Sequence, residues 1–189
     1  MRDLIVTENI TLDGVIDASG GWFGPAGDGP GTDLSDLEGA LRAQAAAADA
    51  FLVGRATFVQ MRGYWPHRTE DTTGVRDHLN AVAKYVVSRT LDEPGWEGTT
   101  VLRGALADEI RELKDRPGKD IVTTGSITLV HALIAAGLVD EYRLFVHPVV
   151  LGRGARLFAD APEGAERGLR LVECRPFRSG VVLLRYRTA

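Results

Sequence analysis

The amino-acid sequence predicts a single α/β domain with a central mixed, mostly parallel sheet flanked by helices and a C-terminal antiparallel hairpin. Short apolar runs typical of buried strands alternate with segments of helical periodicity through most of the chain. The last two runs alternate apolar and polar residues on either side of Arg178-Ser179-Gly180, which is typical of a hairpin. A length of 189 residues suits one domain, expected to span residues 1–189, and no linker or repeat divides it.

The expected strands are short apolar runs bounded by glycine or polar residues. They lie at residues 4–9, 50–53, 84–88, 99–102, 120–123 and 138–151, followed by hairpin strands at 169–175 and 181–187. The expected helices have apolar residues at three- and four-residue spacing. They lie at residues 35–48, 75–83 and 106–113, and a last helix starts at Gly125-Ser126 and ends near Gly137. Residues 54–58 are expected to form a turn.

Composition and charge exclude several classes of protein. The chain has 22 basic and 26 acidic side chains, whereas a general nucleic-acid binder usually has a basic excess, so no nucleic-acid partner is expected. No apolar run approaches the roughly 20 residues of a membrane helix, and the first residues lack the apolar region of a secretory signal. We therefore expect a cytoplasmic protein with no membrane partner. The single Cys174 excludes an internal disulfide, and the histidines show no metal-ligand spacing, so no metal site is expected.

Three of the expected strands end in small or basic polar residues. The segments are Gly54-Arg55-Ala56-Thr57, Ser88-Arg89-Thr90 and Thr124-Gly125-Ser126. In open α/β sheets the ligand crevice lies at the carboxyl ends of the strands, where glycine allows close backbone approach and a following helix offers free N–H groups to an anion. Arginine adds a forked cation that suits phosphate. Any one segment is more simply a turn with a solvated arginine, but the three together predict a local anion site.

Residues 20–31 are rich in glycine and predict either a mobile flap over an active site or an ordinary loop. Asp33, Asp36 and Glu38 follow this stretch closely, and one of them could supply or relay a proton in a pocket. Glu38 also has a purely structural interpretation, because Ser35 and Glu38 fit a capping box at the start of the first helix. The sequence leaves both roles of Glu38 open.

Several motifs, each weak alone, occur in a fairly specific order and spacing. They are Ile10-Thr11-Leu12-Asp13-Gly14-Val15, residues 52–58, residues 85–89, residues 125–129, and residues 138–141 with 148–154. Over almost its whole length the chain resembles the dihydrofolate reductase superfamily. It is most similar to the bacterial group like the C-terminal reductase domain of the bifunctional riboflavin-biosynthesis deaminase/reductase. The resemblance implies a dihydrofolate reductase-like sheet with NADPH bound across its carboxyl edge.

The resemblance also implies cofactor contacts at matching positions. Gly54-Arg55-Ala56-Thr57 matches the segment that holds the cofactor phosphates, Ser88 and Arg89 match the strand end at the adenosine 2′-phosphate, and Gly125-Ser126 matches the turn facing the pyrophosphate. The stretch from Val15 to Gly31 matches the flap over the nicotinamide. The implied cofactor-binding residues are Asn9, Val15, Gly54, Arg55, Ala56, Thr57, Ser88, Arg89, Thr124, Gly125, Ser126 and Ile127.

A substrate pocket is implied between the end of the first strand, the first helix and the flap. Its expected residues are Thr7, Trp22 and Trp65, and the tryptophans would either stack on a flat ring or pack ordinarily. An ungapped count from Gly54 places Glu38 where dihydrofolate reductases keep an acidic residue in the first helix, with Asp36 as a second catalytic candidate. Position 124 is threonine, whereas the riboflavin reductases carry an acidic residue there.

The residues and the resemblance together predict an NADPH-dependent oxidoreductase. It would deliver hydride to a C=N bond of a small pterin- or ribosylaminopyrimidine-like substrate. The alternatives are an NADP(H)-binding dimer without reductase turnover and a structural dimer that has lost the cofactor. We expect a homodimer, because the runs 146–151 and 181–184 carry more apolar surface than the edge of a monomer usually exposes, unless helices cover them.

Overall fold

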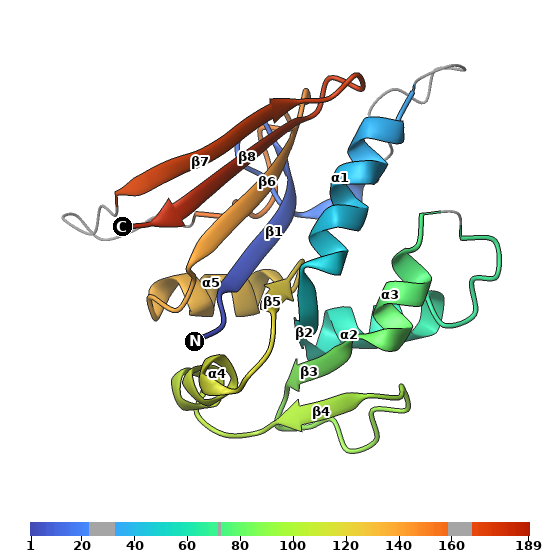
Figure 1. Cartoon of the computed structure of the whole chain (residues 1–189), viewed down its shortest axis with the longest axis vertical. Coiled ribbons are helices and arrows are strands. Elements are labelled where there is room, and N and C mark those ends of the chain that lie inside the picture. The colour runs from blue at the N-terminus through green and yellow to red at the C-terminus, as the bar shows by residue number, and fades with distance from the viewer. Residues whose placement is uncertain (23–32, 72, 159–167) are drawn as a thin grey trace.

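The computed structural model describes residues 1–22, 33–71, 73–158 and 168–189, and these form an eight-stranded sheet with helices on both faces (Figure 1). The order of the strands across the sheet is β4-β3-β2-β5-β1-β6-β8-β7. The strands are β1 (Leu4–Thr11), β2 (Ala48–Gly54), β3 (Ala83–Val87), β4 (Thr99–Leu102), β5 (Asp120–Thr123), β6 (Glu141–His147), β7 (Leu169–Pro176) and β8 (Val182–Thr188).

Every neighbouring pair from β4 to β6 is parallel, and β8 runs antiparallel to both β6 and β7. This arrangement confirms the predicted mostly parallel sheet with a C-terminal hairpin. β6 is shorter than the strand predicted for residues 138–151. The Leu138 N–H still bonds to the Leu133 carbonyl, across Gly137 with its φ of 66°, and so belongs to the end of the preceding helix. At the other end, Pro148 has no N–H to donate to a neighbouring strand.

The helices are α1 (Ser35–Ala46), α2 (Arg55–Tyr64), α3 (Val75–Ala81), α4 (Leu106–Asp115) and α5 (Ile127–Ala135), with a short 3-10 turn η1 (Ala18–Gly20). The expectation of a turn at residues 54–58 is wrong, because α2 begins at Arg55. Its one buried residue is Phe58, so the segment shows no clear apolar stripe in the sequence.

The capping box expected at the start of the first helix is also wrong. Ser35 is already the first helical residue, and the N-cap is Leu34, whose side chain caps nothing. The Ser35 N–H instead donates to Asp33 Oδ1 at 2.9 Å. An aspartate two residues ahead satisfies a free N–H as well as a capping serine does, and the sequence pattern does not distinguish the two. Glu38 therefore has no capping partner and pairs with Arg42 at 3.6 Å.

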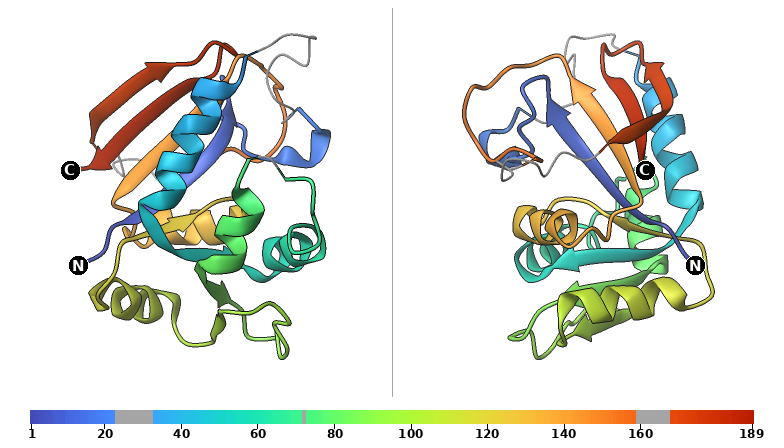
Figure 2. Two further views of the ribbon diagram at one scale, coloured as in Figure 1. Left: turned by 45° about the vertical axis from the view of Figure 1, so that its right-hand side comes forward. Right: turned by 90° about the vertical axis from the view of Figure 1, so that its left-hand side faces the viewer.

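The helices divide between the two faces of the sheet. α4 and α5 pack on one face, where Ile110, Leu113 and Leu133 join Leu4 and Leu52 in the main core. On the other face, α2 and α3 cover β2 and β3 through Phe58 and Leu79, and α1 covers Phe145 through Leu37 and Ala40. The right-hand view of Figure 2 shows α1 and α5 on opposite sides of the sheet.

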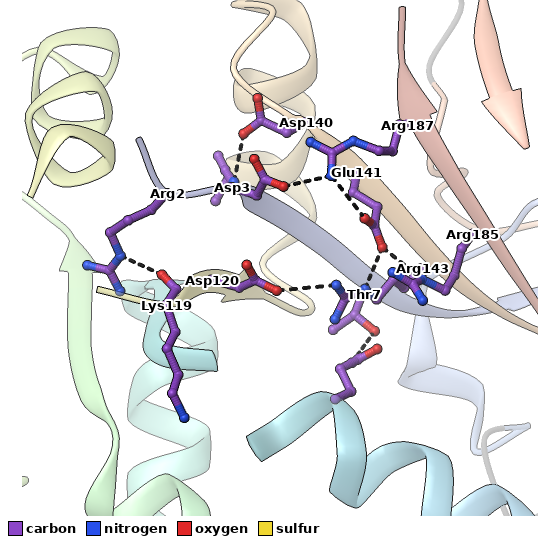
Figure 3. Close-up of polar contacts among 12 residues, drawn as sticks. Arg2, Asp3, Thr7, Lys119, Asp120, Asp140, Glu141, Arg143, Arg185 and Arg187 are labelled. Atoms are coloured by element: carbon purple, nitrogen blue, oxygen red, sulfur yellow. Dashed lines mark hydrogen bonds and ion pairs between the residues drawn. The ribbon is translucent and has the colours of Figure 1, made fainter. Parts of the chain in front are cut away.

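Charged side chains join the central strands at the amino edge of the sheet (Figure 3). The buried Glu141 carboxylate accepts hydrogen bonds from Arg143 at 2.6 Å and from Arg185 at 2.9 Å. Arg143 also pairs with Asp120 at 3.3 Å. Loss of one partner would leave an uncompensated buried charge, so the network favours this alignment of β5, β6 and β8.

Candidate functional site at the carboxyl edge of the sheet

Two helix N-termini meet at the carboxyl edge of the sheet. Gly54 ends β2 and is the N-cap of α2, while Ser126, with a φ of 57°, is the N-cap of α5. The Gly54 N–H donates to Ser126 Oγ at 2.9 Å, and a Cβ on Gly54 would lie only 3.2 Å from the Ser126 Cβ. Because each helix start presents free N–H groups and the positive end of the helix dipole, the pair favours an anion.

The glycine turn before α5 is held by a buried carboxyl group that the sequence analysis did not single out. The Gly125 N–H donates to Glu8 Oε1 at 2.8 Å, and Glu8 is only 4% exposed. Burial raises the pKa of Glu8 to about 8, and the hydrogen bond from Gly125 offsets this only in part. The available signal in the sequence was a charged residue within the otherwise uncharged run Leu4–Thr11.

A pocket of about 420 Å³ lies beyond these helix starts, at the ends of β3 and β4. We call it the basic pocket, because Arg55, Arg89 and Arg103 line it together with Ser88. Arg103 was not predicted, and it donates to the carbonyl oxygens of Arg89 at 3.0 Å and Leu91 at 2.6 Å, which holds the loop after β3. Within the described part of the chain, the guanidinium groups of Arg55 and Arg89 have no hydrogen-bond or ion-pair partner.

A second pocket, of about 340 Å³, lies between α1 and the pair α2 and α3, above β1, β5 and β2. We call it the apolar pocket, since most of its lining is apolar, including Leu41, Ala45, Phe51, Met61, Trp65 and Leu79. Its floor carries the polar residues Thr7, Asn9 and Thr124. Gln44 of α1 donates to Thr7 Oγ1 at 2.8 Å, and Asn9 Oδ1 lies 2.9 Å from His147 Nε2.

The apolar pocket brings together residues that were predicted for different roles. It is lined by Thr7 and Trp65, predicted for the substrate, by Glu38, predicted for catalysis, and by Asn9 and Thr124, predicted for the cofactor. The shared face of β1 and β5 explains the grouping of Thr7, Asn9 and Thr124, because alternate residues of a strand point the same way.

Two of the residues predicted for substrate binding or catalysis, Trp22 and Asp36, line neither pocket. The Trp22 indole N–H donates to the Asp17 carbonyl at 2.6 Å, and the Trp22 ring meets the His147 ring edge-on, 5.6 Å between centroids. The Asp36 carboxylate accepts the Arg178 N–H at 3.0 Å, which ties α1 to the turn between β7 and β8.

The remaining predicted cofactor residues also lie near the carboxyl edge. Ala56 and Thr57 belong to the first turn of α2, and Ile127 is the first residue of α5. Val15 is buried in the loop after β1, where its N–H donates to Thr11 Oγ1 at 2.9 Å. Of the expected flap at residues 15–31, residues 23–31 lie outside the described part of the chain.

Among residues 1–22, 33–71, 73–158 and 168–189, no group of three or more His, Cys, Asp or Glu side chains is placed to hold a metal ion. In the same ranges, no helix has the length and apolar character needed to cross a membrane.

Solved structures share this fold. A putative riboflavin biosynthesis protein from Shewanella sp. PV-4 superposes with a TM-score of 0.77 at 19% identity, over 100% of this chain and 99% of that one. A diaminohydroxyphosphoribosylaminopyrimidine deaminase/5-amino-6-(5-phosphoribosylamino)uracil reductase from Thermotoga maritima gives a TM-score of 0.68 at 16% identity, over 100% of this chain and 57% of that one. At these identities the likeness shows the fold.

The sequence has a nearer relative. It is 35% identical over 188 residues to YyaP, an uncharacterised protein of Bacillus subtilis strain 168, which covers 98% of this chain and 94% of YyaP. The family model of the RibD C-terminal domain matches residues 2–183, almost the whole chain. The match confirms the resemblance drawn from the sequence motifs. The chain, with its two pockets at the carboxyl edge of a dihydrofolate reductase-like sheet, belongs to the RibD C-terminal domain family.

Proposed function

We propose that the protein is an NADPH-dependent reductase that adds hydride to a C=N bond of a small pterin- or ribosylaminopyrimidine-like substrate. One observation carries the proposal: two helix N-termini and a basic pocket share one sheet edge with an apolar pocket on the neighbouring strands. An anion-binding half beside a mostly apolar half is what a phosphorylated nicotinamide cofactor and a ring substrate require.

The residues at this edge fit NADPH by their donor chemistry. Arg55 and Arg89 offer guanidinium groups that no carboxylate neutralises among the described residues, and Ser88 lies beside them. The absence of a side chain at Gly54 leaves room for its close contact with Ser126. In our proposal Arg89 and Ser88 hold the 2′-phosphate that distinguishes NADPH from NADH, and Arg55 with the two helix starts holds the diphosphate.

When bound, NADPH supplies a hydride from its nicotinamide ring, and NADP⁺ is left behind. The chain orients the substrate on the floor formed by Thr7, Asn9 and Thr124 and excludes water with the apolar walls of the pocket. The substrate carbon accepts the hydride, and the substrate nitrogen accepts a proton. We assign the supply of that proton to Glu38, because it is the carboxylate that lines the apolar pocket among the described residues.

The first test measures cofactor choice. Purified protein is titrated with NADPH and with NADH by fluorescence, using wild type and Arg89→Ala. A charged hydrogen bond to phosphate contributes roughly 1.5–3 kcal/mol, so Arg89→Ala should weaken NADPH binding about 10- to 100-fold and leave NADH binding nearly unchanged. Equal losses for both cofactors would contradict the role of Arg89.

Arg170→Ala provides the matched control, because Arg170 is an exposed arginine at the start of β7, on the amino edge of the sheet. Its loss should leave both cofactor affinities unchanged. Oxidation of NADPH is then followed with dihydrofolate and with 5-amino-6-(5-phosphoribosylamino)uracil, the compound named for the Thermotoga maritima relative. Tight NADPH binding without oxidation by either class of compound would favour the alternative of a binding protein without turnover.

A further inference from the structure

The two pockets at the carboxyl edge differ in charge. The basic pocket holds two guanidinium groups without a partner in the described chain, those of Arg55 and Arg89. Among the described residues, the lining of the apolar pocket has one acidic and one basic side chain, Glu38 and Arg42, and these pair with each other at 3.6 Å. An anion in the apolar pocket would therefore compete with Glu38 for the charge of Arg42.

His78 is the remaining titratable group that the described part of the chain contributes to the lining of the apolar pocket. Its partial burial, and secondarily the positive charge of Lys84, lower the pKa of the His78 imidazole. The imidazole is therefore neutral at neutral pH and offers a hydrogen bond without a charge.

A further cation beside the floor of the pocket is already paired. Arg143 is the register neighbour of Thr7 on the same face of the sheet, but it is buried and held by Glu141 and Asp120. Residues 23–31, the C-terminal part of the expected flap, contain no lysine or arginine. Neither source offers a free cation to a ligand in the pocket.

The polar groups on the floor of the pocket are neutral. Thr7, Thr124 and Asn9 present hydroxyl and amide groups, which pair with the uncharged edge of a ring. Burying an ionised group without a cation costs far more free energy than burying a neutral group with hydrogen bonds.

We propose that the apolar pocket takes an uncharged substrate: a flat, largely apolar ring compound whose polar edge meets Thr7, Asn9 and Thr124, and which carries no phosphate or carboxylate group. The reaction assigned to this compound rests on the reductase function proposed above, whereas the preference for a neutral ligand depends on the lining of the pocket alone. A phosphoribosyl compound is accordingly a poor substrate.

The test uses two flat aromatic dyes that differ chiefly by one negative charge. N-phenyl-1-naphthylamine is neutral, and 1-anilinonaphthalene-8-sulfonate carries a sulfonate. Both are titrated by fluorescence into the full-length protein without cofactor, so the result does not depend on NADPH binding. We expect the neutral dye to bind at least about tenfold more tightly than the anionic dye. Equal or tighter binding of the sulfonate would overturn the proposal.

A pair of matched variants locates the dye. Leu41→Arg adds a cation to the wall of the apolar pocket. The change should weaken binding of the neutral dye and reduce the ratio of the two dye affinities to below about threefold. Leu12→Arg makes the same change at an exposed leucine in the loop after β1, outside the pocket, and should leave both affinities unchanged. If Leu12→Arg abolishes dye binding and Leu41→Arg does not, the dye is bound elsewhere and the proposal fails.

Turnover separates this inference from the reductase function. NADPH oxidation is measured with 5-amino-6-(5-phosphoribosylamino)uracil and with the same compound lacking its phosphate. The proposal expects kcat/KM to be at least about tenfold higher without the phosphate. A higher kcat/KM for the phosphorylated compound would overturn the neutral-substrate inference while supporting the reductase. If neither compound is reduced, the reductase proposal fails for this substrate class. The relative affinities of the two dyes then still test whether the apolar pocket prefers a neutral ligand.

Discussion

Glu8 places an ionisable carboxyl group inside the sheet, one residue from the floor of the apolar pocket. Its only hydrogen bond among the described residues comes from the Gly125 N–H. The contact links β1 to the glycine turn that starts α5, so Glu8 supports the backbone to which we assign the cofactor diphosphate. The same burial makes its ionisation unfavourable near neutral pH.

The raised pKa of Glu8 predicts a pH-dependent stability. The pKa rises from an ordinary value of 4.5 to about 8 in the folded chain, so the unfolded chain releases this proton first. Stability from this group is complete below about pH 4.5, falls as the pH rises to about 8, and is constant above. Glu8→Gln keeps an acceptor for Gly125 and removes the ionisation. At about 1.4 kcal/mol per pKa unit, its stability relative to wild type should increase across this window by on the order of 5 kcal/mol.

Denaturant unfolding of the wild type and of Glu8→Gln at several pH values checks this prediction. Glu70→Gln, at an exposed position, controls for the loss of one negative charge. A stability difference between Glu8→Gln and the wild type that stays constant from about pH 5 to about pH 9 would mean that Glu8 does not titrate in this window.

Because Glu38 has no role in a capping box, a substitution of Glu38 tests its role in proton supply more directly. Its one ion pair in the described chain, with Arg42, is exposed, and such pairs contribute roughly 0–1 kcal/mol. Glu38→Gln should therefore barely change the melting temperature. If Glu38 supplies the proton, turnover should fall roughly 10²–10⁴-fold.

Asp36→Asn is the comparison for Glu38→Gln, because Asp36 lies on the same helix but outside the lining of the apolar pocket. Asparagine keeps an oxygen that accepts the Arg178 N–H, so this change should barely lower stability and should preserve turnover per folded molecule. Wild-type turnover of Glu38→Gln from about pH 5 to about pH 9 would remove Glu38 from the mechanism. Asp36, or a water molecule in the pocket, would then be the next candidate.

At the scale of elements, the positions of the apolar residues in the C-terminal hairpin change the reason for expecting a homodimer. Val181 and Leu183, part of the apolar run that suggested an interface, are buried beside Phe145 and Phe177 under α1. Val150, in the other run, is 65% exposed, and further exposed apolar residues lie on the edge strand β7, where Leu171 is 52% and Val172 is 41% exposed. Exposed apolar residues on a long edge strand favour pairing with a second chain.

We predict a homodimer that uses β7. Light scattering at micromolar concentration should give about 41 kDa, twice the 20.4 kDa of one chain. Leu171→Lys should shift the protein toward the monomer, because a charge on an edge strand opposes pairing. Leu12→Lys, at a leucine 70% exposed in the loop after β1, should leave the mass unchanged. A wild-type mass near that of one chain would contradict the prediction.

α2 is a helix that the periodicity of the sequence did not predict. Its apolar contact with the sheet depends on Phe58, and the remaining positions are polar or partly exposed. Its start was nevertheless marked by the Gly54-Arg55 segment, which was identified as an anion-binding turn. The residues at the end of the strand therefore predicted an anion-binding turn, although the helix that follows was not predicted.

At the scale of the whole molecule, the sequence alone determined the C-terminal hairpin, the polar residues at the strand ends and the kinds of element except α2. These features are local, because burial imposes a period of about two residues on strands and 3.6 on helices within a few turns of chain. The order of the motifs indicated the family, and the match over residues 2–183 confirms it. The assigned roles of the site residues stay predictions.

Only the tertiary structure decided which of these residues meet. The strand order β2-β5-β1-β6 brings Gly54 to Ser126 and Glu8 to Gly125. The local spacing of apolar residues in the sequence does not predict these contacts. The strand order also separates the arginines of the basic pocket from the neutral floor around Thr7, and it leaves Trp22 outside the apolar pocket. Contacts between distant segments depend on which strands pair and which face each helix covers, and both are settled by packing of the whole sheet.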